Sequence, residues 1–386
     1  MTKFILRRIV RGLTALFLFQ SLLFALIYAL PYDFSAFIIG GGPTLRQLIQ
    51  RQLGLDQSFA EQYFGWLWDF LRLDLGESFL YWPTPVSTVI FNRLPRTLLL
   101  FLPAVVIAYL LGIWLGKVIA WHRGGVLEFG VTLVAIASYT SFAPWLAFLI
   151  VNIFGWHLGW LPYRRLVDHN IWFNAPVTVD WLLSHLVATA VLAGGAVLLV
   201  WRITHRHVRP GPARWALRLG TVALSSATAW AWWVQSGMGY LAQDVLSHLT
   251  LPLLTVVLLS FGETMMMMRT SMLETMSEDY VLMARAKGLP EKRIRDHHAA
   301  RNAILPVITR LALNLPFVLV GSLVIELVFQ WHAMGKVIFD AIEWQDIPVL
   351  MGILSVVGML AVLAHVVLDI LYVYLDPRLR YVERGA

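Results

Sequence analysis

Long runs of apolar residues recur along this chain, and they limit its fold more than any other feature. Hydrophobic residues make up 59% of its 386 residues and charged residues only 14%. Soluble domains are nearer a quarter charged, and a membrane-spanning helix needs about 20 apolar residues in succession. The runs therefore predict an all-α, polytopic membrane helical bundle. We expect about eight transmembrane helices, at residues 10–30, 96–120, 130–154, 183–201, 216–234, 249–268, 310–330 and 349–374.

Positive charge gathers on one side of this predicted topology. With the N-terminus in the cytoplasm, the inner segments hold 22 of the 30 Lys and Arg residues. Cytoplasmic loops carry such an excess, so both termini are predicted to be cytoplasmic. The first apolar run is long enough to span and lacks a small-residue cleavage site, which favours an uncleaved helix over a signal peptide. The residues behind the net charge of +7 are then expected to lie in inner loops and beside lipid headgroups, and we expect no nucleic acid partner.

Motifs for several kinds of chemistry are absent from the sequence. The chain has no Cys, which excludes disulfides, thiol catalysis and Cys-based metal sites. ATP use needs a G-x-x-x-x-G-K-[ST] loop, and Gly335-Lys336 is followed by Val337 with no Gly at the required spacing. Neighbouring helical side chains point apart, so neither Met265–Met268 nor His297-His298 predicts a metal site. We expect no catalytic residue, metal or cofactor in this chain itself.

Residues 279–309 form the most polar and basic stretch of their length, between two apolar segments. Helix formers run from Glu278 to Gly288, where a positive φ can end the helix. Pro290 suits the first turn of a second helix, which we expect to end at Pro306. Two short helices would then meet at a corner of small residues that fits a groove of another protein. Cations beside that corner could meet an acidic or polar rim: Arg285, Lys287, Lys292, Arg293 and Arg295. An ordinary basic inner loop is the alternative.

The residues of this stretch form a specific motif. It reads Ala284-Arg285-Ala286-Lys287-Gly288-Leu289, then His298, Arg301-Asn302 and Leu305-Pro306. An Ala-rich turn, a Gly and a later Leu-Pro resemble the coupling loop of ABC importer permeases. The residues at these positions are similar to those of the oligopeptide/dipeptide/nickel (binding-protein-dependent importer) family in particular. Other segments resemble the same family: FILRRI at 4–9, RLPRTL at 93–98, HLTLPLLTVVLLSF at 248–261, GSLVIELVF at 321–329 and LDILYVYLDPRLRY at 368–381.

The resemblance implies a type I ABC importer permease-like core that forms the translocation pathway for peptides or a related small solute. Implied partners are membrane lipids, a homologous second permease subunit, two cytoplasmic ABC ATPase subunits that bind ATP and Mg, and an extracytoplasmic solute-binding protein. The implied location is a bacterial or archaeal inner (plasma) membrane. The ATPase-coupling residues that it implies are Ala284, Arg285, Ala286, Lys287, Gly288, Leu289, His298, Arg301, Asn302 and Pro306.

Three features depart from the family pattern. Pro31-Tyr32-Asp33 replaces an expected Pro-Gly-Asp, and His332-Ala333-Met334-Gly335 replaces Pro-Gly-x-Gly. Residues 165–245 read as an insertion that contains two extra transmembrane helices. The expected division is then as follows: 1–30 cytoplasmic end and first helix, 31–94 extracytoplasmic segment, 95–164 core helices, 165–245 insertion, and 246–386 core with the coupling loop at 271–308.

Acidic residues within apolar spans leave a second function open. Glu263, Glu326 and Asp369 lie in predicted spans, where acids are costly and often functional. They could serve a proton-coupled secondary transporter, line a pathway or gate it, or make structural hydrogen bonds. Glu326 also matches a recurring Glu of the family pattern. Met267 is a further pathway or gating candidate, with packing as the alternative.

Overall fold

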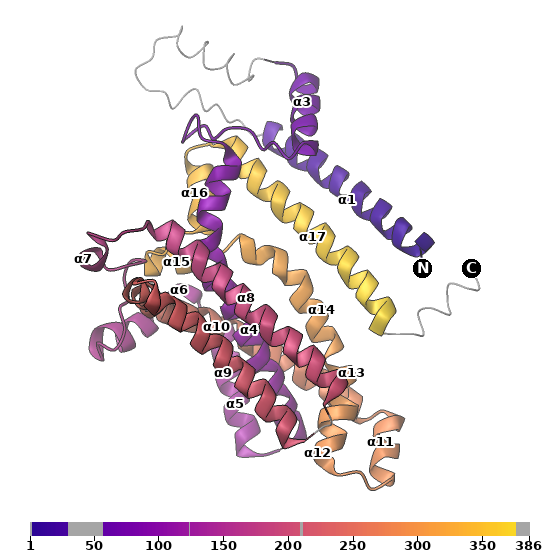
Figure 1. Ribbon diagram of the computed structural model, residues 1–386. Coiled ribbons are helices and arrows are strands. Elements are labelled where there is room, and N and C mark those ends of the chain that lie inside the picture. The colour runs from indigo at the N-terminus through magenta and orange to yellow at the C-terminus, as the bar shows by residue number, and fades with distance from the viewer. Residues whose placement is uncertain (1, 30–56, 123, 209–210, 376–386) are drawn as a thin grey trace.

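The computed structural model describes residues 2–29, 57–122, 124–208 and 211–375. Within these ranges the chain is helical and has no β-strand, which confirms the predicted all-α fold. Long helices lie side by side in a bundle (Figure 1). Short helices α11 (Asp279–Ala286) and α12 (Glu291–Arg293) lie at one end, which we call the loop end, and α3 (Phe59–Leu71) and α16 (Met334–Glu343) lie at the opposite, far end.

Two long helices form the centre of the bundle, α4 (Val86–Trp121) and α10 (Gly239–Met276). They approach closely because Gly112 and Gly116 face α10. An added Cβ would lie 2.7 Å from the Thr264 Cβ at the first position and 2.6 Å from the Met265 carbonyl oxygen at the second. Close approach at small residues is the usual way for helices to pack where lipid removes the hydrophobic drive. The G-x-x-x-G motif therefore acts within this chain.

The span predicted at 130–154 is sharply bent in the structure. The chain forms α5 (Val126–Thr140), α6 (Ala143–Ile150) and the π-helix η2 (Val151–His157), and the direction turns by 111° between α5 and α6. Ser141 and Phe142 are extended, and Pro144 occupies the first turn of α6. Proline lacks an N–H and suits that position, so it starts a new helix here. An averaged apolar run does not reveal this break.

The span predicted at 310–330 is also interrupted. It comprises α14 (Leu305–Asn314), the 3₁₀ turn η4 (Leu315–Leu319) and α15 (Leu323–Phe329). Gly321 between η4 and α15 has φ +68°, which a helix cannot contain. The remaining long helices, α1 (Thr2–Ala29) and α17 (Ile347–Leu375), pack on one another, and Ser355 Oγ donates to Gln20 Oε1 at 2.9 Å. Residues 31–56 of the predicted outer segment, including Pro31-Tyr32-Asp33, lie outside the described ranges.

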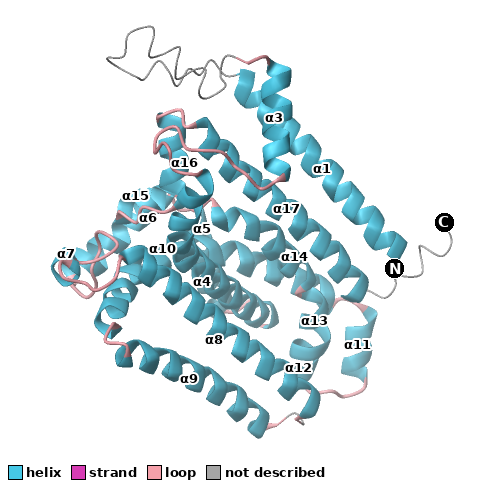
Figure 2. Ribbon diagram, turned by 45° about the horizontal axis from the view of Figure 1, so that its top comes forward, coloured by secondary structure: helices cyan, strands magenta, loops and turns pink. Residues whose placement is uncertain are grey.

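The predicted insertion contains α7 (His169–Trp172), α8 (Val179–His207) and α9 (Pro212–Gln235). Helices α8 and α9 form an antiparallel pair on one side of the bundle (Figure 2). Five of the described helices are long and apolar enough to cross a membrane, or up to seven spans if each bent pair counts as one. Helix α8 belongs to this set and α9 does not, since α9 contains Arg214, Arg218 and several Ser and Thr residues. The span predicted at 216–234 therefore corresponds to α9, a helix of lower apolar content.

Candidate functional site

The predicted coupling loop forms a corner at the loop end. Helix α11 ends at Ala286, and Gly288 turns the chain with φ +70°. An added Cβ at Gly288 would meet no atom within 4 Å, so the corner faces open space. Pro290 then caps α12 in an extended conformation. The predicted two-helix corner is present, and Gly288 is its pivot because L side chains rarely adopt this φ.

The second arm of the loop runs on further than the sequence indicates. It comprises α12, the π-helix η3 (Ile294–Ala299) and α13 (Ala300–Ala303), and it continues into α14 after a 44° bend. We expected the second helix to end at Pro306. Pro306 instead lies in the first turn of α14, where its missing N–H is harmless.

One face of both arms is buried against the central helices. Val281 and Ala284 of α11 share a cluster with Met268 and Met272 of α10 and Ala120 of α4. The second arm and the start of α14 add further buried side chains to this cluster: Ile294, Ala299, Ala303 and Val307. The loop is therefore packed against the ends of α4 and α10 along its back.

Polar contacts close the loop from the sides. Lys117 Nζ of α4 lies 3.1 Å from Asp296 Oδ1, and Arg295 also bonds to Asp296. Asn302 Nδ2 donates to Tyr280 Oη at 2.9 Å and joins the two arms. Burial of the phenol raises the pKa of Tyr280, against the lowering effect of that hydrogen bond.

The predicted coupling residues divide between the buried back and the free face. Ala284 is buried, and Leu289 and His298 are half-buried. The free face carries the other seven predicted residues: Arg285, Ala286, Lys287, Gly288, Arg301, Asn302 and Pro306. Leu282 and Met283 are also exposed, at 49% and 56%, and they extend this face with apolar surface. Sequence reasoning missed these two, although they stand between the buried positions of α11.

The predicted pathway residues do not form one cluster. Glu263 of α10 is half-exposed and forms an ion pair with Arg310 of α14. Met267 is half-buried and packs against the cluster behind the coupling loop. Asp369 lies in α17, and its side chain falls outside the described residues. Within the described ranges no group of three or more His, Asp or Glu could hold a metal ion.

Glu326 is fully buried at the far end and caps a helix. Its carboxylate accepts backbone N–H bonds from Ala333 at 3.0 Å, Gly335 at 2.9 Å and Lys336 at 2.8 Å, at the start of α16. A carboxylate is favourable at a helix N-terminus, where free N–H groups and the helix dipole meet it. A Cβ at Gly335 would lie 2.7 Å from Glu326 Oε1, so this approach needs Gly.

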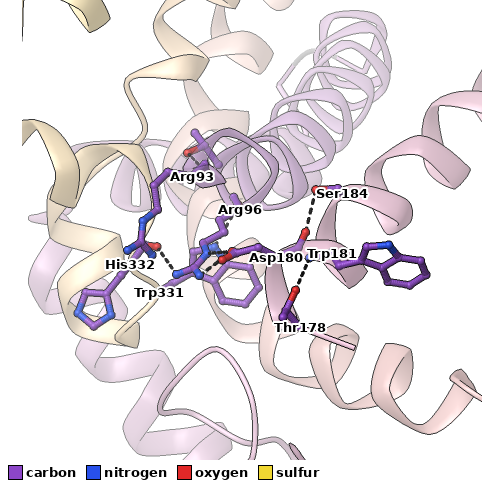
Figure 3. Close-up of polar contacts among 9 residues, drawn as sticks. Arg93, Arg96, Thr178, Asp180, Trp181, Ser184, Trp331 and His332 are labelled. Carbon is purple, nitrogen blue, oxygen red and sulfur yellow. Dashed lines mark hydrogen bonds and ion pairs between the residues drawn. The ribbon is translucent and has the colours of Figure 1, made fainter. Parts of the chain in front are cut away.

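A second far-end junction joins the predicted insertion to the core (Figure 3). Arg96 Nε of α4 donates to Asp180 Oδ1 of α8 at 2.7 Å, and Arg96 Nη1 donates to the His332 carbonyl at 3.1 Å. Trp331 Nε1 returns a bond to the Arg96 carbonyl at 3.1 Å. Arg96 thus links α4, α8 and the loop before α16. The sequence marks Arg96 only as part of the start of a span, and nothing in it pairs Arg96 with Asp180.

Known proteins similar to this chain share its whole length. A putative peptide transport system permease protein of Brucella abortus (strain 2308) is 31% identical over 99% of this chain and 100% of its own. A di/tripeptide transport system permease protein of Pseudomonas aeruginosa (strain UCBPP-PA14) is 29% identical over 99% of both chains. An oligopeptide transport system permease protein of Bacillus subtilis (strain 168) is 26% identical over 99% of this chain and 100% of its own.

Two family descriptions divide the chain between them. Residues 1–101 match the N-terminal part of the binding-protein-dependent transport system membrane component. Residues 108–381 match the binding-protein-dependent transport system inner membrane component, and this match includes α10, the corner at Gly288 and the second arm. The chain therefore belongs to the family of binding-protein-dependent transport system inner membrane components, the multi-pass permease subunits of ABC importers.

Proposed function

We propose that this chain forms half of a translocation pathway for peptides, or a related small solute, and that residues 279–306 couple it to ATP hydrolysis on separate subunits. Its partners are a homologous second permease, two ATPase subunits that bind ATP and Mg, and a solute-binding protein outside the membrane. The loop end then faces the cytoplasm, with both chain termini, and the far end faces the binding protein. Residues 165–245 are an insertion relative to the family core.

The two-faced construction of the loop is the observation that carries this proposal. The back of α11 is buried on the central helices through Val281 and Ala284. The front exposes small and apolar side chains around Gly288, where nothing lies within 4 Å of an added Cβ. A groove on an ATPase subunit can receive such a corner in the way that grooves receive short helices. Force applied at the corner then reaches α4 and α10 through the buried back.

The proposed cycle follows from this arrangement. ATP closes the ATPase dimer and draws the loops of the two permeases together. The central helices open the pathway at the far end, where the binding protein releases its solute. Hydrolysis resets the pathway toward the cytoplasm. No residue of this chain does covalent chemistry in these steps.

The described acids give little support to a proton-coupled mechanism. The Glu263 carboxylate is held by Arg310, and three backbone N–H groups occupy that of Glu326. A proton relay passes protons from one acid to the next, and these two acids are bound by separate partners at different places in the bundle. In this proposal Glu326 therefore has a structural role, in which it holds α16 against α15.

Replacing Gly288 tests the coupling role. A side chain at φ +70° costs about 1–2 kcal/mol of backbone strain and blocks the open corner. We expect Gly288→Val to abolish uptake of a labelled oligopeptide and capture of the ATPase subunits. Gly237→Val is a matched control, because Gly237 has φ +72° and open space but lies in the turn before α10. Uptake at the wild-type rate in Gly288→Val, or equal loss in both variants, would falsify the assignment.

A further inference from the structure

A basic cavity of about 1240 Å³ lies at the loop end, between the start of α9 and the second arm of the coupling loop. Arg214 enters its wall from α9, and Lys292, Arg293 and Arg301 enter from α12 and α13. His297 and His298 lie among them. The start of α9 lies near α12 in the bundle (Figure 1). Residues that are about 80 positions apart in the chain thus form one cationic surface.

The cations of this cavity lack counter-charges. Nε and Nη2 of Arg214 are both buried, and neither has a hydrogen-bond partner. Asp296 also lines the wall, but Lys117 and Arg295 already bind its carboxylate. Across the described ranges no ion pair joins Arg214, Lys292, Arg293 or Arg301 to an acid. Buried cationic groups without partners are costly, so the cavity favours an anionic occupant.

Aromatic side chains near the cavity favour a position at the edge of the lipid. The Arg218 guanidinium lies 4.9 Å from the Trp201 ring and 5.8 Å from the Trp215 ring, and these groups lie on α8 and α9 just beyond the cavity. Tryptophan gathers at the level of lipid headgroups. Further along the helices the surface is apolar and exposed, at 68% for Leu198 and 65% for Leu219. A ligand with a negative head and apolar tails therefore matches both surfaces.

We propose that this cavity binds the phosphate of an anionic phospholipid, whose acyl chains lie along the exposed faces of α8 and α9. A phosphodiester offers oxygen acceptors that suit the guanidinium forks of Arg214 and Arg293. Basic pockets between membrane helices on the cytoplasmic side are typical sites for anionic headgroups. The bound phosphate joins the start of α9 to the second arm of the loop. Lipid composition then influences the part of the chain that the proposed function couples to ATP.

Native mass spectrometry of the purified full-length chain tests this directly. The probes are phosphatidylglycerol and phosphatidylcholine with the same acyl chains, added to delipidated protein in detergent. The wild type should retain about one phosphatidylglycerol and little phosphatidylcholine. Arg214→Gln with Arg293→Gln should weaken phosphatidylglycerol binding by about 10- to 30-fold, as expected for two cations at an anionic surface. Equal retention of the two lipids by the wild type would overturn the proposal.

Arg202→Gln with Arg206→Gln is the matched control. It removes the same charge from the exposed end of α8, outside the cavity wall, and should change binding less than twofold. Equal loss in both double variants would mean general attraction to a basic surface and would reject the site. Should the first double variant fold poorly, Arg293→Gln alone serves, because Arg293 is exposed.

Inorganic phosphate separates a lipid from a soluble anion. Millimolar phosphate should displace little of the bound phosphatidylglycerol, because it lacks the acyl chains. Full displacement would assign the cavity to a soluble phosphate compound and refute the lipid. A normal lipid occupancy with lost ATPase capture in the double variant would assign these cations to an acidic protein rim instead. None of the lipid measurements requires transport, so their failure leaves the proposed function untouched.

Discussion

The helix pair α4–α10, of 36 and 38 residues, and the shorter helix pair α8–α9, of 29 and 24 residues, have opposite surroundings. In α10, 56% of the most apolar stretch is buried, against 11% in α8. The α4–α10 contact has backbone against backbone at Gly112 and Gly116, whereas Gly194 and Gly195 of α8 have no atom within 4 Å of an added Cβ. The same residue type therefore serves close packing in one pair and only faces open space in the other.

The buried apolar side chains of α8 and α9 lie at one end of the pair. Leu182, Leu183 and Leu186 are buried near the start of α8, and Trp233 is buried near the end of α9. Arg96 and Asp180 reinforce the same end. Toward the loop end, exposed Leu and Trp side chains cover both helices. The pair is thus attached at the far end, while lipid or another subunit must cover the rest.

Glycine-to-alanine substitutions should separate the two helix pairs by the largest difference in stability. Gly116→Ala should destabilise the chain by about 1–3 kcal/mol, because the new methyl would lie 2.6 Å from the Met265 carbonyl oxygen. Gly195→Ala should be neutral or stabilise by up to about 1 kcal/mol, because Ala favours a helix and meets no neighbour. Thermal unfolding of each purified variant in detergent measures both. Equal shifts in melting temperature would contradict the contrast between the two pairs.

Leucine truncation sharpens the comparison within α8 itself. Leu183→Ala should cost about 2 kcal/mol, because Leu183 is fully buried and its removal leaves a cavity. Leu199→Ala should change stability by less than about 0.5 kcal/mol, because Leu199 is 59% exposed. The same unfolding measurement applies. A large loss at Leu199 would mean that the exposed half of α8 packs on something within the chain.

The ion pair at the far end should have the smallest effect. The Asp180 side chain is 42% exposed, so solvent screens its attraction to Arg96. Asp180→Asn should cost about 0.5–1 kcal/mol. A double-mutant cycle with Arg96→Gln isolates the coupling, since Arg96 also bonds to the His332 carbonyl. A coupling energy near zero would show that Leu182 and Leu183, and not charge, hold α8 in place.

Sequence reasoning predicted the helical class, the long helices and the corner at Gly288. These follow from apolar runs and from the backbone freedom of Gly, which act locally. The breaks at Ser141 and Gly321 were missed, because the flanking residues are apolar enough to read as continuous spans. Local sequence patterns predict that a helix forms but do not predict where it bends.

Contacts between distant residues lay beyond that reasoning. A buried acid at position 326 was expected, but its donors are backbone N–H groups of a helix start that composition does not reveal. Arg214 and Arg293 meet in one cavity only because α8 brings the chain to the loop end, where α9 begins. The coupling role of the loop remains a prediction that Gly288→Val can test.

Helix α10 has a mechanical consequence. Its 38 residues form one element about 57 Å long, from the turn before Gly239 to the coupling loop. The return route through α14, η4 and α15 has joints at Ile304 and Gly321. A single rod transmits displacement along its whole length, while a jointed arm absorbs part of it. We therefore expect α10, whose one internal proline is Pro252, to be stiffer than the return route, whose joints would let the far end change shape.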